Sequence, residues 1–501
     1  MMASTLIILP LLVPLAACAV TAMLRGNLMA QRGVSLIASA ALLACAVALL
    51  RHVLHEGVVA VQMGDWPAPF GITLVVDGFS AVMVVIAGVM ALAIAVYGCA
   101  KGMLSRERAG FHPLFHGLLL GVVGSFLTGD LFNLYVWFEV MLIASFGLLA
   151  LGGSREQIDG ALKYAVLNLT GTTLFLVALA FLYAATGTLS MADLASKVPL
   201  IENKGLVAAT ALLLLVAFGL KAAVFPLFFW LPASYHTAPA PIVAIFAGLL
   251  TKVGLYAMIR VYTLIYGGES EWLSPIIGIV AGFTMITGVL GAAAHYDIRR
   301  ILAFHIVSQI GFMLLGLAIW TPLALAGAIL YVIHHIVVKA NLFLIAGLIE
   351  RLGGSYRLQE LGGLSRPYPW LALLFLIPAL SLAGLPPLSG FWGKLVVIRA
   401  GLEAGHIFLA GVALAVGLLT LFSMVKIWNL AFWKAAPAHA PPSHGVAPGH
   451  LWLMVTPIAS LAAITLAIGF WAEPVVAFSM NAAGALLVPD DYIHAVLGGA
   501  R

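Results

Sequence analysis

The stretch LKAAVFPLFFWLPASYHTAPAPIVAIFAGLLTKVG, residues 220–254, decides the fold, because it is apolar enough for a membrane yet carries charge and proline. A lysine at the bilayer centre costs about 2.5–3.5 kcal/mol on insertion scales, so membrane lysines are rare and usually face polar surroundings. This stretch holds two, Lys221 and Lys252. Proline removes a backbone donor, and broken helices at membrane depth occur where they are buried in protein or line a wet cavity. Between the lysines stand Pro226, Pro232, Pro239 and Pro241. Charge beside broken backbone predicts an ion pathway.

The composition of the whole chain is that of an all-α polytopic membrane protein. Of its 501 residues 63% are hydrophobic and 9% are charged, whereas soluble domains carry about 25% charged residues. A membrane helix needs about 20 apolar residues, and on that template we expect about 14 transmembrane helices. Their centres lie near Val13, Leu43, Val85, Leu120, Met141, Leu176, Leu215, Leu249, Phe283, Gly311, Val337, Leu380, Leu418 and Ile464.

The basic residues between these segments predict the orientation, because cytoplasmic loops carry an excess of lysine and arginine. Alternate loops hold Arg25, Arg32, Lys101, Arg106, Arg108, Arg155, Lys163, Arg299, Arg300, Arg351, Arg357, Arg366 and Lys434. The opposite set holds only Arg51, Lys197, Lys204, Arg260, Arg399 and Arg501. The first set is therefore predicted to be cytoplasmic, and both termini to lie outside. Five lysines fall within the membrane: Lys221, Lys252, Lys339, Lys394 and Lys426.

A second broken helix is predicted at SLAGLPPLSGFWGK, residues 381–394, with the break at Pro386 and Pro387. It lies five segments after the first break, an interval that reverses the orientation in the membrane. Paired broken helices at matching positions are typical of inverted repeats with an ion site near the midplane. We therefore expect two inverted five-helix repeats, each with a broken helix. The expected regions are 1–110 (three helices), 111–265 (first repeat), 266–434 (second repeat), 435–450 (cytoplasmic linker) and 451–501 (a last helix and tail).

Glu139 is the one carboxylate deep in its apolar segment, and Lys221 is its natural partner. A pair that opens and closes changes the proton affinity of both groups, as a gated relay requires. The alternative is a static ion pair that holds two helices together. Lys252 and Lys339 have no carboxylate in their own segments, and burial eases the release of a lysine proton near neutral pH. For Lys426, near the end of its segment, snorkelling to the interface is an equal alternative.

The histidines are weaker candidates, although the side chain titrates near neutrality and suits a proton shuttle. His334 and His335 point to different faces of one helix, so at most one is expected to face a polar path. His305 and His335 are as consistent with packing as with transfer, and His236 in the proline-rich turn is as consistent with a turn as with proton uptake. His439, His444 and His450 lie in or beside the linker, where a flexible loop defines no metal geometry.

Several functions are not indicated by the sequence. There is no nucleotide-binding G-x-x-x-x-G-K-[ST] loop and no dinucleotide fingerprint after a strand. There is no H-E-x-x-H motif or nucleophile elbow. Cys18, Cys45 and Cys99 lie in apolar segments without C-x-x-C spacing. The basic residues are dispersed, which does not indicate nucleic-acid binding. We therefore expect no cofactor, no metal site and no catalytic residues, and a gradient or partner subunits must supply any energy.

The stretch 220–254 resembles the core signature of the proton-translocating antiporter-like subunits of respiratory complex I and Mrp-type cation/proton antiporters. The likeness covers nearly the whole chain and is greatest for the D-type subunits of Mrp antiporters. It is carried by TAPAPIVAIFAGLLTKVG, YVIHHIVVKANLFLIAGLIE and SLAGLPPLSGFWGKLVVIRAGL. The resemblance implies that Glu139 pairs with Lys221, that Lys252 is the central lysine, that His335 and Lys339 lie on the polar axis, and that Lys394 is the terminal group.

The resemblance further implies exchange of protons for Na⁺, K⁺ or Li⁺ by a hetero-oligomer in the bacterial cytoplasmic membrane, in which this chain supplies a proton path. Two alternatives stay open. One is a proton-pumping subunit of a respiratory NADH dehydrogenase or hydrogenase complex. The other is a structural subunit whose charged residues no longer conduct.

Overall fold

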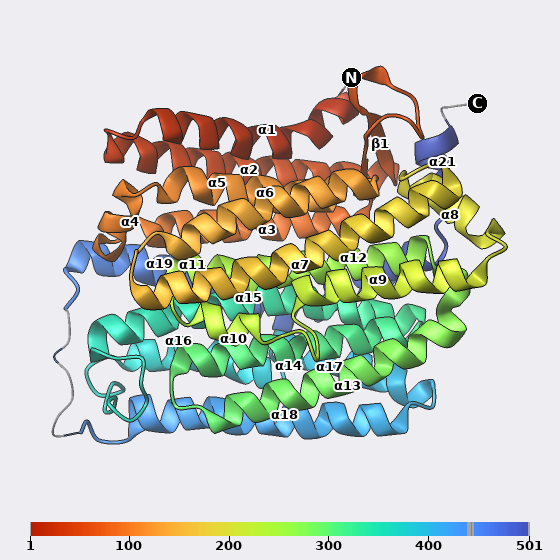
Figure 1. The fold of residues 1–501 in the computed structure, drawn as a ribbon. Helices are drawn as coiled ribbons and strands as arrows, with labels where there is room; N and C mark the ends of the chain where they lie inside the picture. Colours follow the sequence, from red (N-terminus) through yellow and green to blue (C-terminus); the bar gives the residue numbers. More distant parts are fainter. Residues whose placement is uncertain (1, 438–441, 443–444, 499–501) are drawn as a thin grey trace.

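The computed structural model describes residues 2–437, 442 and 445–498, which form a bundle of nearly parallel and antiparallel helices (Figure 1). The long helices, in chain order, are α1 (Met2–Met23), α2 (Leu28–Glu56), α3 (Gly78–Gly98), α5 (Phe111–Leu127), α6 (Leu131–Ala150), α7 (Arg155–Thr186), α9 (Lys204–Ala222), α11 (Ala240–Ile245) with a π-helix (Phe246–Leu250) and α12 (Thr251–Leu264), α13 (Ser270–Ala294), α14 (Ile298–Ile319), α15 (Pro322–Gly353), α16 (Pro369–Ala383), α17 (Ser389–Glu403), α18 (Ile407–Trp428) and α19 (Pro448–Phe470). Shorter elements are α4 (Leu104–Arg108), α8 (Met191–Lys197), α10 (Trp230–Tyr235), α20 (Ala472–Leu487) and α21 (Asp490–Leu497).

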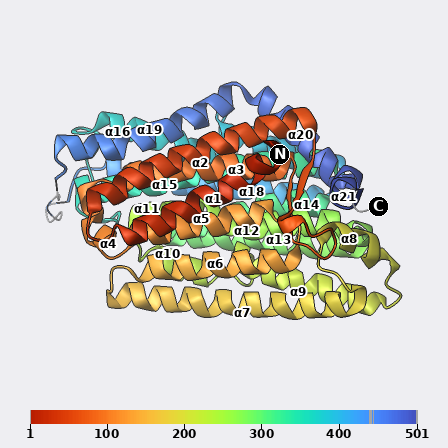
Figure 2. The same ribbon diagram turned by 90° about the horizontal axis from the view of Figure 1, so that it is seen from above.

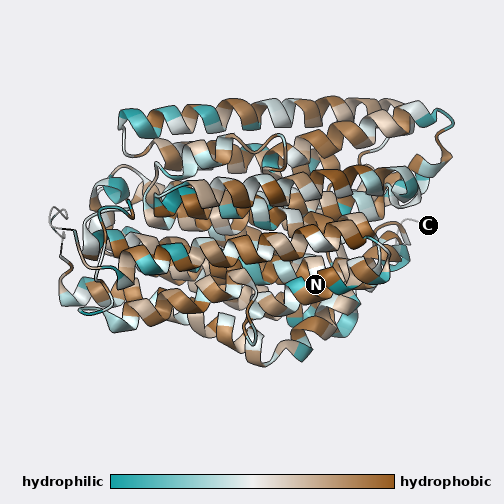
Figure 3. Ribbon diagram, turned by 90° about the horizontal axis from the view of Figure 1, so that it is seen from below, coloured by the Kyte–Doolittle hydropathy of each residue, from teal (hydrophilic) through white to brown (hydrophobic). Residues whose placement is uncertain are grey.

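The helices confirm a polytopic membrane protein. Twelve helices among the described residues are long and apolar enough to cross a membrane, or thirteen if the bent pair α20–α21 is one span. The apolar but shorter α5 and α16 account for the other two predicted segments. Figure 3 shows hydrophobic residues along the middle of the helices and hydrophilic residues gathered toward their ends. The described chain begins and ends at the same end of the bundle (Figure 1).

Local sequence sets where the helices begin and end. Asp77 starts α3 with a capping box, in which its carboxylate accepts a hydrogen bond from the backbone N–H of Ser80 and the Ser80 hydroxyl accepts one from the backbone N–H of Asp77. Thr321 caps α15 by accepting from the N–H of Ala324. Gly354 ends α15 at φ 81°, in the left-handed region that glycine adopts without a steric penalty.

The interior of the bundle is formed by α11–α12, α14 and α15. The apolar windows of α11–α12 and α15 are completely buried, whereas those of α2, α7 and α18 are largely exposed at the edges. Figures 1 and 2 agree that α15 runs through the middle, with α1 and α18 at opposite edges of one view and α7 and α19 at opposite edges of the other. The membrane lysines on α12 and α15 are therefore surrounded by protein.

Three features were not foreseen. A two-stranded antiparallel sheet, β1 (Val59–Gln62) and β2 (Thr73–Val76), pairs Val59 with Val76 near the end of the bundle where the chain starts. The expected tail after the last long helix is itself helical, as α20 and α21. Helix α19 begins at Pro448, within the region predicted to be a linker (435–450). Part of that predicted linker, including His439 and His444, lies outside the described residues.

Candidate functional site

The first break separates α9 from α10 and places Lys221 one residue before the end of α9. Ala223 is left-handed at φ 60° and ends the helix, with its N–H directed at the carbonyls of Gly219 and Leu220. The indole of Trp230 on α10 donates to the Leu220 carbonyl at 2.9 Å, so the two halves stay joined by a side chain. Pro226 lies within the break, as predicted. Pro232 lies in the first turn of α10, where a missing N–H leaves no intrahelical bond unmade.

Lys221 lies close to Glu139 of the neighbouring helix α6 but does not form an ion pair with it. The Lys221 side chain is buried, its Nζ has no hydrogen-bond partner among the described residues, and it lies 5.4 Å from the ring centroid of Phe138. Glu139 is the next residue on α6 and is partly exposed, on the face that also exposes Val136 and Ile143. The two predicted partners are therefore far apart in the sequence and close in the fold, but they are not bonded in this conformation.

Lys252 lies at the start of α12, directly after the π-helix Phe246–Leu250. A π-turn spaces its hydrogen bonds five residues apart and disturbs the regular helical ladder. The Lys252 ammonium donates to the carbonyl of Ala247, five residues earlier, at 2.5 Å. Next to it, Gly254 packs on Lys221, since a Cβ on Gly254 would lie 3.0 Å from the Lys221 Cβ. The helix defect and the close glycine contact bring the two lysine-bearing segments together.

Helix α15 supplies two buried histidines and a buried lysine. Lys339 donates to the Leu302 carbonyl on α14 at 3.1 Å. His335 has no hydrogen-bond partner on either ring nitrogen among the described residues, and the charges that act on it are those of Lys252, Lys339 and Lys394. His334 Nδ1 is 2.8 Å from the Ser389 hydroxyl of the second break. Both histidines are buried and lie beside the Tyr331 ring. His334 faces the broken helix through Ser389, whereas His335 faces the lysines.

The second break lies between α16 and α17 and contains Pro386 and Pro387, as predicted. Gly384 ends α16 at φ 93°. Lys394 reaches back from α17 and donates to the carbonyls of Leu382 and Ala383 at 2.9 and 3.1 Å, where the negative end of the α16 dipole lies. Its ammonium is 4.6 Å from the centroid of the Phe312 ring. Lys394 therefore caps the broken helix, whereas Lys221 is left without such a bond.

The remaining candidates differ in their surroundings. His305 on α14 is buried with neither ring nitrogen bonded among the described residues. Lys426 caps the C-terminus of α13 by donating to the carbonyls of Ala293 and His295, both at 2.7 Å. His236 lies at the wall of an open recess of about 840 Å³, with Nδ1 2.8 Å from the Pro232 carbonyl.

Sequence reasoning missed several buried polar groups on the same axis. Gln309 on α14 accepts a hydrogen bond from the Tyr331 hydroxyl and donates to Thr420 on α18 at 3.3 Å. Asn341 on α15 and Thr251 beside Lys252 are buried without hydrogen-bond partners among the described residues. Nothing in the sequence joins these residues, and only the packing shows that they share one interior.

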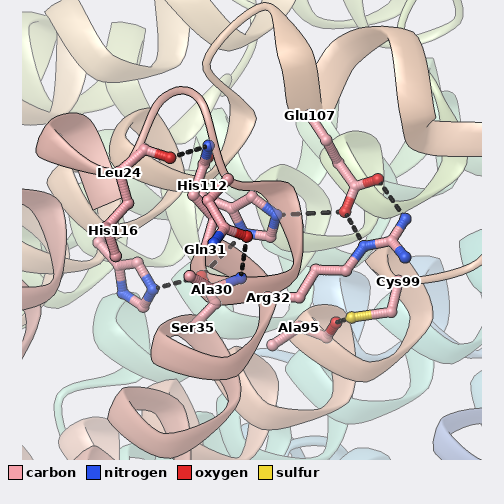
Figure 4. Close-up of polar contacts among 11 residues, drawn as sticks. Leu24, Ala30, Gln31, Arg32, Ser35, Ala95, Cys99, Glu107, His112 and His116 are labelled. Carbon is pink, nitrogen blue, oxygen red and sulfur yellow. Dashed lines mark hydrogen bonds and ion pairs between the residues drawn. The ribbon is translucent and has the colours of Figure 1, made fainter. Parts of the chain in front are cut away.

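A second polar cluster lies at the end of the bundle that the basic residues predict to be cytoplasmic (Figure 4). The Arg32 guanidinium donates twice to Glu107, at 2.8 and 2.6 Å. His112 Nε2 lies 3.1 Å from Glu107, and the Ser35 hydroxyl lies 2.8 Å from His112 Nδ1 and 2.9 Å from His116 Nε2. Burial raises the pKa of Glu107, but the bonds from Arg32 and His112 outweigh this and hold that pKa below its ordinary value.

The sequence signal for this cluster was the spacing of His112 and His116, four residues apart at the start of an apolar helix. An ionised Glu107 requires a hydrogen on the His112 nitrogen that faces it, so a neutral His112 accepts from Ser35, and Ser35 accepts from His116. The chain of bonds ties α2, α4 and α5 together.

Arg260 is not a loop residue, as the orientation analysis assumed. It lies in α12 with 4% of its surface exposed, and Nη2 is 2.6 Å from Asp77, which is 5% exposed. Its guanidinium also lies 5.6 and 5.1 Å from the ring centroids of Tyr256 and Tyr492. Burial raises the pKa of Asp77, but the Arg260 charge and the Ser80 bonds outweigh it and lower the pKa overall. A partner carboxylate from α3 is what permits this arginine inside the bundle.

Comparison with known proteins decides the family. The family described as NADH:quinone oxidoreductase/Mrp antiporter, transmembrane, matches residues 128–420. The chain belongs to this family. The match contains Glu139, Lys221, Lys252, Lys339 and Lys394, whereas the Glu107 cluster lies before it and Lys426 after it.

Individual relatives of the family resemble the chain over its whole length. The D-type Na(+)/H(+) antiporter subunit of Alkalihalophilus pseudofirmus is 46% identical over 494 residues, which cover 99% of each chain. The D-type Na(+)/H(+) antiporter subunit of Bacillus subtilis is 40% identical, over 98% of this chain and 99% of the relative. A chain in the structure of the Mrp complex from Dietzia sp. superposes with a TM-score of 0.91 at 34% identity, covering 99% of this chain and all of that one. The fold expected from the resemblance is thereby confirmed.

Proposed function

We propose that this chain is the proton-translocating subunit of a multisubunit Na⁺/H⁺ antiporter. The observation that carries the proposal is a set of lysines and histidines buried in one helix bundle, several of them without protein partners. Buried polar groups normally have hydrogen-bond partners, from protein or ordered water. The unpaired atoms of Thr251, His305, His335 and Asn341 therefore indicate a hydrated interior. The names of the full-length relatives supply the exchanged ions.

The proposed path starts at Glu139 and Lys221 and continues through Lys252, His335 and Lys339 to Lys394. Lys252 and Lys394 both lie close enough to Lys339 for their charges to act on it. In a medium of low dielectric constant like charges repel, so a proton that arrives at one lysine promotes release from the next. The link between Lys221 and Lys252 is the packing of Gly254 on Lys221, so movement at the first break is transmitted to α12.

We assign three further features on the same basis. The two repeats are residues 111–265 and 266–434, since the breaks interrupt corresponding helices, counted from the start of each range. The membrane is the bacterial cytoplasmic membrane. Both termini face outside, because most loop arginines and lysines belong to the other end of the bundle.

The test measures ion exchange in inside-out vesicles from cells lacking their own antiporters, which express this chain with its neighbouring genes. The vesicles are energised, Na⁺, K⁺ or Li⁺ is added, and collapse of the pH gradient is followed. We expect cation-dependent collapse in wild type and in the control Lys204→Ala, and none in Lys221→Ala at equal abundance of the complex. Lys204 is the matched control because it is an exposed lysine at the other end of the same helix.

Two outcomes favour the alternatives. An assembled complex that gives no collapse with any cation supports a pump driven by electron transfer, since the family includes NADH:quinone oxidoreductase subunits. If Lys221→Ala lowers the yield of complex while transport per complex stays normal, the chain is a structural subunit.

A further inference from the structure

An arginine-lined cavity is bounded by residues of α4, the start of α11 and α19. These three elements lie at one end of the bundle (Figures 1 and 2). Its volume is about 270 Å³. Three guanidinium groups line it, from Arg106 on α4, Arg299 in the first turn of α14 and Arg351 in the last turn of α15. We call it the arginine cavity. It is separate from the lysine axis, and it is bounded by segments far apart in the sequence.

Two of the three arginines, Arg299 and Arg351, are held in position by neighbouring residues. The Arg299 guanidinium carbon lies 3.9 Å from the Tyr356 ring centroid, which fixes the plane of the group. The Arg351 guanidinium fills the space beside Gly102, where a Cβ would approach its Nη2 to 2.2 Å. Burial raises the pKa of Tyr356 to about 12, so its hydroxyl stays neutral and adds no negative charge.

The charges in the cavity are not balanced. Among the described residues that line it, Glu350 is the one carboxylate against three arginines, and its oxygen lies 3.6 Å from Arg351 Nε. Arg299 has a further carboxylate, Asp297, at 3.7 Å outside the cavity lining. The Nε atoms of Arg106 and Arg299 are buried and have no hydrogen-bond partner among the described residues. Buried donors of this kind are normally satisfied. The cavity therefore offers unused donors and excess positive charge.

We propose that the arginine cavity binds a phosphate group, carried by an anionic phospholipid or by free phosphate. The planar guanidinium offers parallel donors that match phosphate oxygens, and basic pockets between membrane helices on the cytoplasmic side suit lipid headgroups. Apolar side chains of Met103, Pro239, Pro241 and Met454 complete the wall and can accommodate the start of an acyl chain. A bound phosphate would join α4, α14 and α15 and hold the turn from which α11 leads to Lys252.

The test uses the complete complex, purified from cells expressing this chain with its neighbouring genes. Nanodiscs of phosphatidylcholine with and without phosphatidylglycerol provide the lipid arm, read by native mass spectrometry of retained lipid. Inorganic phosphate provides the second arm, read by thermal melting. The variant is Arg106→Gln with Arg351→Gln. The control is Arg25→Gln with Arg155→Gln, which removes the same charge at exposed positions outside the cavity.

We expect wild type and control to bind alike, and the cavity variant to bind on the order of tenfold more weakly or worse, because each arginine contributes charged hydrogen bonds. A loss confined to phosphatidylglycerol retention identifies a lipid, and a loss confined to the phosphate-induced shift identifies free phosphate. If neither ligand distinguishes the cavity variant from the control, the proposal is wrong. Should the glutamine variant not assemble, Arg106→Lys with Arg351→Lys decides: it keeps the charge but loses the paired donors, so unchanged binding of both ligands would overturn the proposal.

Discussion

Replacing Lys221 by methionine should make the protein more stable while it abolishes transport. Lys221 is 3% exposed, and its ammonium makes no hydrogen bond or ion pair among the described residues. The effective cost of burying an ion is several kcal/mol. The cation–π contact with the Phe138 ring, whose centroid lies 5.4 Å from the ammonium, offsets about 2 kcal/mol of this cost at most. Methionine has a similar length and no charge, so we expect Lys221→Met to raise the free energy of unfolding by about 1–4 kcal/mol.

Lys394→Met gives the comparison within the same protein, because Lys394 is equally buried but bonded. It would lose two carbonyl hydrogen bonds at 2.9 and 3.1 Å and leave the end of α16 uncapped. An unsatisfied buried group costs about 1–3 kcal/mol, so Lys394→Met should be less stable than Lys221→Met.

The assay is thermal melting of the purified complex, with vesicle transport measured in parallel and Lys204→Met as the control for loss of one positive charge from α9. Lys221→Met should melt above wild type, Lys394→Met below Lys221→Met, and Lys204→Met at the temperature of wild type. A Lys221→Met complex that melts well below wild type would show that Lys221 is stably bonded and would refute the reasoning. Stabilisation together with normal transport would remove Lys221 from the proton path.

Four other substitutions test the polar groups at the ends of the bundle. Arg260→Gln leaves the Asp77 carboxylate buried without its partner at 2.6 Å, so it should lower the free energy of unfolding by about 3–5 kcal/mol. Adding Asp77→Asn should restore most of that stability when denaturation of the complex is measured. If the double variant is no more stable than Arg260→Gln, the two side chains are not coupled. The bonds from Arg32 lower the pKa of Glu107 in the folded protein. The ionised carboxylate therefore stabilises the fold above the unfolded pKa of about 4.3, and this stabilisation is lost as the pH falls below that value. In melting temperatures measured over a series of pH values, Glu107→Gln should remove this decrease in stability at low pH. Burial raises the pKa of Asp130 to about 6, so the folded protein retains a proton that the unfolded chain releases near pH 3.9. The free energy of unfolding should therefore fall as the pH rises between these two values. Asp130→Asn should flatten this dependence of stability on pH, and an unchanged dependence would contradict the burial argument.

Much of the fold could be predicted because membrane insertion is a local constraint. Each helix must satisfy its own backbone in lipid and must be about 20 residues long, so length and apolarity identify it without knowledge of its neighbours. The short helices α5 and α16 were still found, since their apolar runs are continuous. The sheet β1–β2 was missed because its strands are short, and helices α20–α21 were missed because a bend of 66° divides that stretch into two short helices.

The sequence by itself determined the membrane class, the two proline-rich breaks and the lysines that lie among apolar residues, because each is a conflict between one residue and its local surroundings. Only the tertiary structure decided which of these groups are bonded. Lys252 bonds to Ala247 because a π-turn places that carbonyl within its reach, and Lys394 caps α16 because the chain folds back at the second break. The pairing of Arg260 with Asp77 and the bonds that join Glu107 to His112 and Ser35 depend on helices that meet only after the bundle packs. Hydrogen bonds act over about 3 Å, so their partners are fixed by packing, whereas burial in the membrane can be inferred from the residues of one helix.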